Sequence, residues 1–187
     1  MIFQPTPSQT VGPYFAICLP FDGQELVVPE DTPGAIRIFG TIYDGAAEPI
    51  PDHVIETWQP DPEGLFADLH GHGGSSRMPG FRGFGRHGEE DGEGNWEIVT
   101  VKPGRVPGPD GNLQAPHIDV TVMARGMLNR VVTRIYFADE PDANATDPVL
   151  ARVPADRRHT LLAEPADRGY RFDIRVQGHD ETVFFAV

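Results

Sequence analysis

Short segments in which apolar and polar residues alternate run through most of the chain, and this period of two is typical of half-buried β-strands. The clearest pair lies in HIDVTVMARGMLNRVVTRIYF, residues 117–137, where two runs of β-formers flank a basic connection at Gly126. Further strands are predicted from 35 to a turn at 44–45, from 53 to 59, from 95 to a turn at 103–104, and on both sides of a turn at 178–180. Seven to nine strands spaced by turns predict an all-β sandwich.

Four segments depart from this alternation. Residues 63–92 are dense in Gly, His and Arg and show no periodicity, which predicts a long loop, although its phenylalanines argue against full disorder. Residues 139–148 read as a polar loop, and residues 147–163 are predicted to contain a short helix interrupted at Pro154. The Pro-rich start, residues 5–20, predicts an extended arm whose apolar side chains dock against this chain or a partner.

Length and charge limit the possible classes. A chain of 187 residues is predicted to form one domain. Its net charge of −13 disfavours binding to nucleic acid or to an anionic membrane surface. Cys18 is the single cysteine, the start lacks a charged segment followed by an apolar run, and no stretch reaches membrane-spanning length. We therefore expect a cytoplasmic protein.

The clearest indication of a metal-binding site is the pair His117 and Asp119. A two-residue spacing on a strand presents imidazole and carboxylate on one face, as in facial-triad iron(II) sites. Such a pair needs a third ligand, for which His159 and His179 have permissive spacing. Without that ligand, a structural histidine beside a solvated aspartate is the more common arrangement.

The Gly-rich segment contains further histidines, and its flexible backbone would allow them to surround a metal ion. Most histidines of this kind, however, are exposed loop residues that bind no metal. The histidines of this segment are His70, His72 and His87.

Arg125 stands at the end of a predicted strand, a position from which a guanidinium grips a planar carboxylate in a bidentate way. With Arg130 and Arg134 it forms a local excess of positive charge, which suggests a nearby anion. On spacing alone, an ordinary surface ion pair with one of the 28 acidic residues is favoured.

Several segments, in order from Pro5 to Phe185, resemble the intradiol ring-cleaving dioxygenases. They are TPSQTVGPYF, GTIYDG, VIETWQPDPEGLF, GFGR, NWEIVTVKPG, APHIDVTVMARG, TRIYF and YRFDIRVQGHDETVFF. The resemblance implies a transthyretin-like β-sandwich with long loops, as one domain over residues 1–187, with an arm at 1–34 and the sandwich at 35–187. It also implies a two-chain enzyme whose beta chain binds non-haem Fe(III) through two tyrosinates and two histidines.

Carried over by position, three of the family's four iron ligands are lost from this chain, and only His117 is kept. The two tyrosines fall on Phe66 and Val106, and the paired histidines fall on His117 and Asp119. Gln114 replaces an arginine of the catalytic chain. Phe66 and Val106 have no donor atom, so the resemblance implies a non-iron alpha chain that binds no metal and carries no catalytic residue of its own.

The resemblance implies that this chain completes its partner's active site. Thr10, Gly12 and Pro13 would line the pocket, with Tyr14 close behind, and Arg125 would face the carboxylate of 3,4-dihydroxybenzoate. The expected reaction is intradiol cleavage with O2 to 3-carboxy-cis,cis-muconate, a step of aromatic-compound catabolism in the beta-ketoadipate pathway, in a higher-order alpha-beta oligomer. The alternatives are a stand-alone β-sandwich binding module without catalysis and a self-sufficient iron(II) enzyme.

Overall fold

The computed structural model describes residues 18–68, 76–88, 92–108 and 110–186, and this part of the chain is nearly all β. The strands are β1 (Ala35–Tyr43), β2 (His53–Trp58), β3 (Phe84–Gly88), β4 (Asn95–Val101), β5 (His117–Ala124), β6 (Val131–Phe137), β7 (Leu162–Ala166), β8 (Gly169–Arg171) and β9 (Ile174–Arg175). The predicted all-β class is confirmed.

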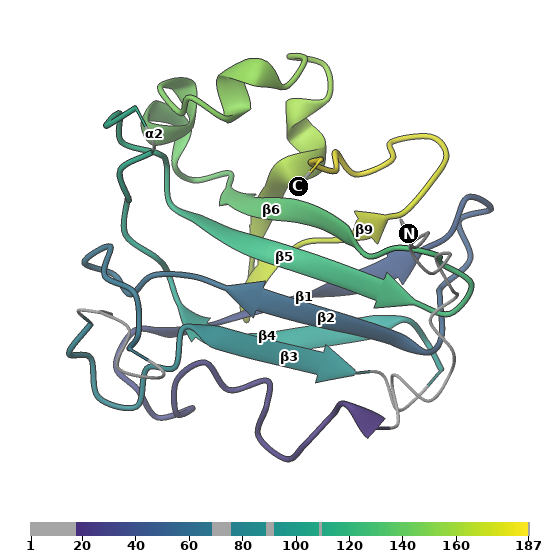
Figure 1. Ribbon diagram of the computed structural model, residues 1–187, viewed down its shortest axis with the longest axis horizontal. Coiled ribbons are helices and arrows are strands. Elements are labelled where there is room, and N and C mark those ends of the chain that lie inside the picture. Colours follow the sequence, from purple (N-terminus) through teal and green to yellow (C-terminus); the bar gives the residue numbers. More distant parts are fainter. Residues whose placement is uncertain (1–17, 69–75, 89–91, 109, 187) are drawn as a thin grey trace, which may run out of the picture.

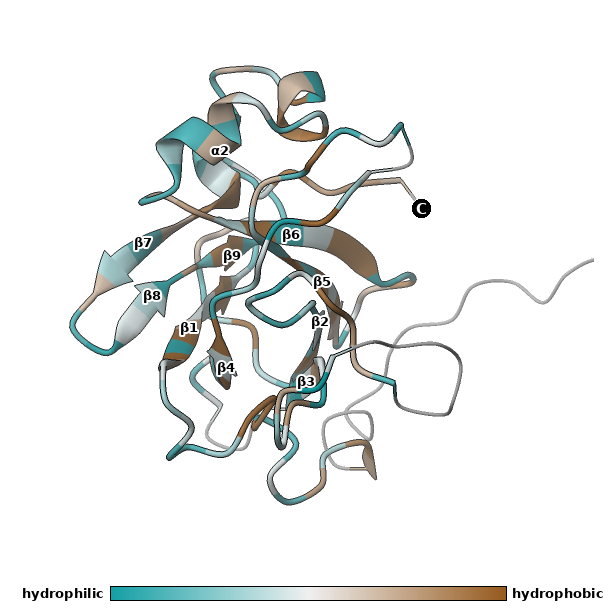
Figure 2. Ribbon diagram, turned by 90° about the vertical axis from the view of Figure 1, so that its left-hand side faces the viewer, coloured by the Kyte–Doolittle hydropathy of each residue, from teal (hydrophilic) through white to brown (hydrophobic). Residues whose placement is uncertain are grey.

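The strands form one hydrogen-bonded sheet in the order β3-β2-β5-β6-β7-β8-β1-β4, and β9 pairs with β1. The sheet folds back between β6 and β7, so that β6, β5, β2 and β3 form a layer in front of β1 and β4 (Figure 1). In the side view, β7, β8, β1 and β4 lie to the left of β5, β2 and β3 (Figure 2). Both layers bury apolar side chains in one core, among them Ile55, Val120 and Ile135 in front and Ile38, Trp96 and Ile98 behind.

The segment 24–28 joins the two ends of this sheet. Val27 donates a backbone hydrogen bond to Val99 of β4, at 2.8 Å, and Arg86 of β3 donates one to Gln24, at 2.9 Å. Val27 and Val28 are buried. The segment thereby covers two edge strands that would otherwise present unpaired backbone groups.

A cap of short helices lies between β6 and β7, above β6 in Figure 1. It comprises α2 (Pro141–Ala145), η1 (Leu150–Arg152) and η2 (Arg158–Leu161). The predicted short helix within 147–163 is present as the two 3-10 helices η1 and η2, whereas α2 lies in the predicted polar loop and was not expected. Pro154 does separate the two 3-10 helices. None of the helices in the described part of the chain is long and apolar enough to span a membrane.

β3 was not expected, because FGRHG contains two glycines that lower its β-propensity. It nevertheless pairs with β2 from Phe84 opposite Trp58 to Gly88 opposite Val54. Packing explains Gly85, where an added Cβ would lie 2.8 Å from both Thr57 Oγ1 and Val27 Cγ2. A glycine that weakens the local strand signal is therefore required by the close approach of its neighbours.

The C-terminal segment also differs from the prediction. β9 precedes the turn at 178–180, but the described residues 181–186 form no strand. They are held by isolated hydrogen bonds, among them one from the amide of Thr182 to the carbonyl of Arg175 at 2.9 Å and one from the amide of Phe185 to the carbonyl of Val132 at 2.8 Å.

Candidate functional site

The predicted metal-capable pair lies at the start of β5, beside β6. His117 stands opposite Tyr136 and Asp119 opposite Arg134 in the antiparallel register. Because alternate residues of a strand share a face, these four side chains project from one side of the sheet. His117 is 5% exposed, whereas the Asp119 side chain is 43% exposed, so the pair runs from the interior to the surface.

Arg134 connects this pair to the neighbouring loop. Its Nε donates to Asp119 Oδ1 at 2.8 Å, and its Nη1 donates to Gln114 Oε1 at 2.7 Å and to the Tyr136 hydroxyl oxygen at 3.4 Å. Burial opposes the guanidinium charge, but the Asp119 carboxylate and the Tyr136 hydroxyl outweigh it, and the pKa of Arg134 is raised. The positive charge is therefore fixed on this face of the sheet.

Tyr136 continues the contacts into the cap. Its hydroxyl donates to Asp147 Oδ1 at 3.3 Å, and burial raises the pKa of this phenol. Asp147 is fully buried and accepts backbone hydrogen bonds from Ala115 at 2.7 Å and from Val149 and Leu150 at 2.8 Å each. We call the five side chains of Gln114, Asp119, Arg134, Tyr136 and Asp147 the Arg134 network.

The orientation of His117 follows from one hydrogen bond. Its Nδ1 lies 2.8 Å from the carbonyl oxygen of Ala115. A carbonyl oxygen only accepts, so Nδ1 carries the proton and Nε2 keeps its lone pair. Burial, followed by the charge of Arg134, lowers the pKa of His117, which keeps the imidazole neutral.

Phe66 and Val106, the two positions where the resemblance places lost tyrosines, belong to the same neighbourhood. The Phe66 ring stacks on Trp58 with centroids 5.9 Å apart and an interplanar angle of 7°, and Trp58 stands opposite Asp119. Val106 is buried, and its carbonyl accepts the backbone N–H of Gln114 at 2.9 Å. Neither side chain has a donor atom and Asp119 is bound by a cation, so this site does not fit an iron ion.

The other histidines do not complete a metal site in the described residues. His159 Nε2 lies 3.5 Å from Asp180 Oδ1, and His179 Nδ1 lies 2.8 Å from Asp180 Oδ2, in an exposed turn. His87 stacks on His53, whereas His70 and His72 lie outside the described residues. Within the described ranges no three His, Cys, Asp or Glu side chains form a group that could hold a metal.

Arg125 directly follows β5 and forms the surface ion pair that its spacing favours. Its Nη1 lies 3.0 Å from Asp52 Oδ2, and its backbone N–H donates to the Asp52 carbonyl at 3.1 Å. The Arg125 side chain is 55% exposed. The nearby anions of both Arg125 and Arg134 are thus carboxylates of this chain. The four arm residues Thr10, Gly12, Pro13 and Tyr14 lie outside the described residues.

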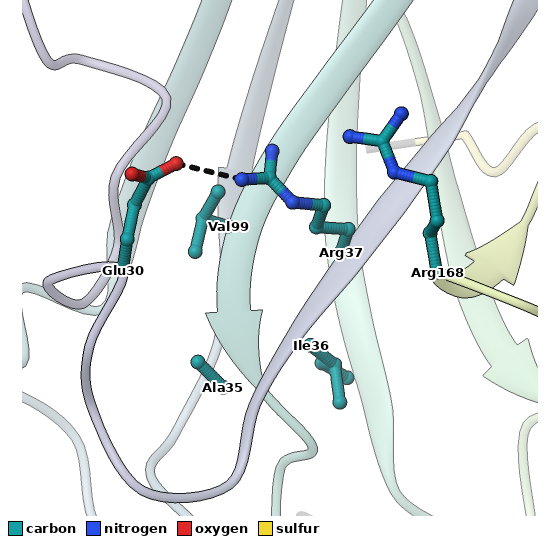
Figure 3. Close-up of a pocket in the computed structure, with 6 residues that line it drawn as sticks. All are labelled: Glu30, Ala35, Ile36, Arg37, Val99 and Arg168. Carbon is teal, nitrogen blue, oxygen red and sulfur yellow. Dashed lines mark hydrogen bonds and ion pairs between the residues drawn. The ribbon is translucent and has the colours of Figure 1, made fainter.

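A shallow pocket lies elsewhere, beside β1 and β4 (Figure 3). Arg37 forms an ion pair with Glu30 at 2.6 Å and another with Glu97, and Arg168 lies 3.7 Å from Glu97. These two arginines are balanced by two carboxylates of the chain. The lining contains none of the residues that the sequence singled out; it consists of Glu30, Ala35, Ile36, Arg37, Val99 and Arg168.

The roles of Tyr136 and Asp147 are not predicted from the sequence, in which Arg134 stands out only as part of a basic run. A usable signal existed for Arg134, because pairing the two strands on either side of Gly126 places it opposite Asp119. Asp147 gave no signal, since its partners come from residues 115, 136, 149 and 150 only after the cap has folded.

Residues 10–178 match the family model described as "Dioxygenase". The dioxygenase domain of a carbohydrate-binding fusion protein from Streptomyces sp. SirexAA-E superposes with a TM-score of 0.59 at 27% identity, over 94% of this chain and 99% of that one. The chain therefore belongs to the intradiol ring-cleaving dioxygenase family.

Within the family, the chain is similar to protocatechuate 3,4-dioxygenase alpha chains. It is 43% identical to that of Burkholderia cepacia, over 97% of both chains, and 40% identical to that of Pseudomonas putida, over 96% of this chain and 95% of the relative. The Burkholderia cepacia beta chain is 30% identical, over 79% of this chain and 66% of that chain.

Proposed function

We propose that this chain is the alpha subunit of a protocatechuate 3,4-dioxygenase and that it works beside a beta chain that holds the iron. The observation that carries the proposal is the similarity over nearly the whole chain to alpha chains, with 43% identity. The side chains support the same assignment, since Phe66 and Val106 offer no ligand atoms at the family's iron position.

In this proposal the beta chain holds the iron, and this chain contributes to substrate binding. The reaction is intradiol cleavage of 3,4-dihydroxybenzoate, in which both atoms of O2 enter the product, 3-carboxy-cis,cis-muconate. Fe(III) on the beta chain supplies the activation of the catechol. The similarity of this chain to a beta chain supports a pair built from two related sandwiches.

This chain contributes substrate binding in the proposal, chiefly through Arg125. A guanidinium has five N–H donors in a planar fork, and the structure shows an ion pair of Arg125 with Asp52 through one terminal nitrogen. Because the Arg125 side chain is 55% exposed, its guanidinium can also donate hydrogen bonds to the planar carboxylate of protocatechuate. Thr10, Gly12, Pro13 and Tyr14 would line the same pocket from the arm.

The stand-alone binding module is the second candidate, and the similarity to protocatechuate 3,4-dioxygenase alpha chains does not favour it. A well-behaved monomer on gel filtration, indifferent to a co-expressed beta chain, would support that alternative. The cytoplasmic location, the higher-order oligomer and the place in the beta-ketoadipate pathway stay predictions.

Co-expression with a beta chain tests the proposal. We expect a complex of the two chains that contains about one iron per pair, is visibly coloured because ferric tyrosinate absorbs visible light, and consumes O2 with protocatechuate. The chain purified alone is expected to be colourless and inactive. A coloured lone chain would show that its ligands were misassigned, and a failure of the two chains to associate would contradict the alpha-subunit role.

A further inference from the structure

Three oxygen atoms of this chain converge on one cation at the start of β5. They belong to the Asp119 carboxylate, the Gln114 amide and the Tyr136 hydroxyl, at 2.8, 2.7 and 3.4 Å from nitrogens of the Arg134 guanidinium. Carboxylate and amide oxygens around one positive charge are also the usual surroundings of a bound metal ion. Here an organic cation stands at the centre.

A nitrogen ligand is available on the same strand face. His117 lies two residues before Asp119 and its Nδ1 is bound to the Ala115 carbonyl, which leaves the lone pair on Nε2. Metal-ligating histidines are commonly oriented by such a bond from the other ring nitrogen. The imidazole is therefore already in the tautomer that binds a metal through Nε2.

We propose that the Arg134 guanidinium takes the place of a metal ion on this face. It thereby blocks a latent divalent-metal site formed by His117, Asp119 and Gln114. The guanidinium compensates the Asp119 charge and repels any divalent cation near it. Arginine does not lose its proton in proteins, so a change of pH does not open the site.

The same guanidinium connects separate segments of the chain, as a bound metal ion often does. It ties β5 through Asp119 and the loop before β5 through Gln114, while Tyr136 links it to Asp147 in the cap. Three separate segments are thereby held by one positively charged group. Removing the charge should loosen these contacts and expose the ligands at the same time.

The test is a Co2+ titration of the full chain, followed by the visible absorption of the metal and by calorimetry. Arg134→Gln removes the charge and keeps a side chain that can hydrogen-bond. We expect this variant to bind one Co2+ with a Kd at least tenfold lower than that of the unaltered chain. Arg134→Lys is the matched control, because it keeps the positive charge and should show no gain. Adding His117→Gln to Arg134→Gln should abolish the gain.

The proposal is overturned if folded Arg134→Gln, checked by circular dichroism, binds Co2+ no better than Arg134→Lys. Asp119→His provides a second test that leaves Arg134 in place, in case Arg134→Gln does not fold. This variant places two imidazoles on the strand, and we expect it to remain without Co2+ because the guanidinium is still present. Tight binding by Asp119→His would contradict the proposal. The titration involves no protocatechuate and no turnover, so its outcome is independent of the proposed function.

Discussion

Replacing Asp147 with alanine should strongly destabilise the chain, because its carboxylate connects the cap to the loop before β5 and to β6. The side chain is fully buried and accepts hydrogen bonds from three backbone amides and from the Tyr136 hydroxyl. A hydrogen bond to a charged group contributes about 1.5–3 kcal/mol, and such contributions from one network do not add fully. We therefore expect the free energy of unfolding to fall by about 4 kcal/mol.

Urea unfolding followed by circular dichroism measures this change. For a chain of this length, a loss of about 4 kcal/mol corresponds to a Tm lowered by roughly 10 °C. Asp142→Ala, at an exposed position of α2, is the matched control and should change stability by less than about 0.5 kcal/mol. Asp147→Asn should fall between the two, because one oxygen acceptor remains. A loss below about 1 kcal/mol in Asp147→Ala would refute the central role of this carboxylate.

Three further changes have distinct expected results. In Lys102, burial opposes the charge, but hydrogen bonds to two carboxylates and to Tyr170 raise the pKa to about 12. Its stabilisation is thus complete below about pH 10.5 and lost as the pH rises through 12, so urea unfolding of Lys102→Met should converge with the unaltered chain over that range. Gly40→Ala would place a Cβ 1.9 Å from the Phe172 carbonyl and should lower the Tm sharply, whereas Gly45→Ala, whose nearest atom is 3.5 Å away, should not. Asp52 has a φ of 57°, so Asp52→Val should cost about 1–2 kcal/mol in thermal unfolding and Asp52→Asn almost nothing.

The strands that carry the core could be predicted from the sequence, because each buries one face and alternates accordingly. In β5 the buried positions Ile118, Val120 and Val122 alternate with partly exposed ones, so the pattern alone locates the strand and the shared face of His117 and Asp119. β3 could not be predicted in this way, since Gly85 is selected by its close neighbours rather than by strand propensity.

The site could be predicted only in part, for a different physical reason. The side chains of Phe66 and Val106 have no oxygen atom whatever the fold. The loss of these two metal ligands can therefore be predicted from the sequence alone. What replaces the metal depends on register and on distant contacts, because Arg134 meets Asp119 across two strands and Gln114 from a preceding loop. Sequence spacing likewise favoured an ion pair for Arg125, and only the fold identifies Asp52 as its partner.

The kinetics of Arg125→Ala in the assembled complex test most directly whether this chain completes its partner's active site. Losing a desolvated charged contact costs about 2–5 kcal/mol, and the lower end applies because Asp52 already shares this guanidinium. About 2 kcal/mol corresponds to a roughly 30-fold lower kcat/KM for protocatechuate, mainly through KM.

Catechol, which lacks the carboxylate, provides the internal control for this measurement. Its kcat/KM should change less than about twofold in the same variant, since the contact removed is to the carboxylate. The iron content of the complex should also stay the same. If Arg125 binds the carboxylate of the substrate, the loss should be confined to protocatechuate. Unchanged kinetics with protocatechuate, or an equal loss with both substrates, would contradict this role of Arg125.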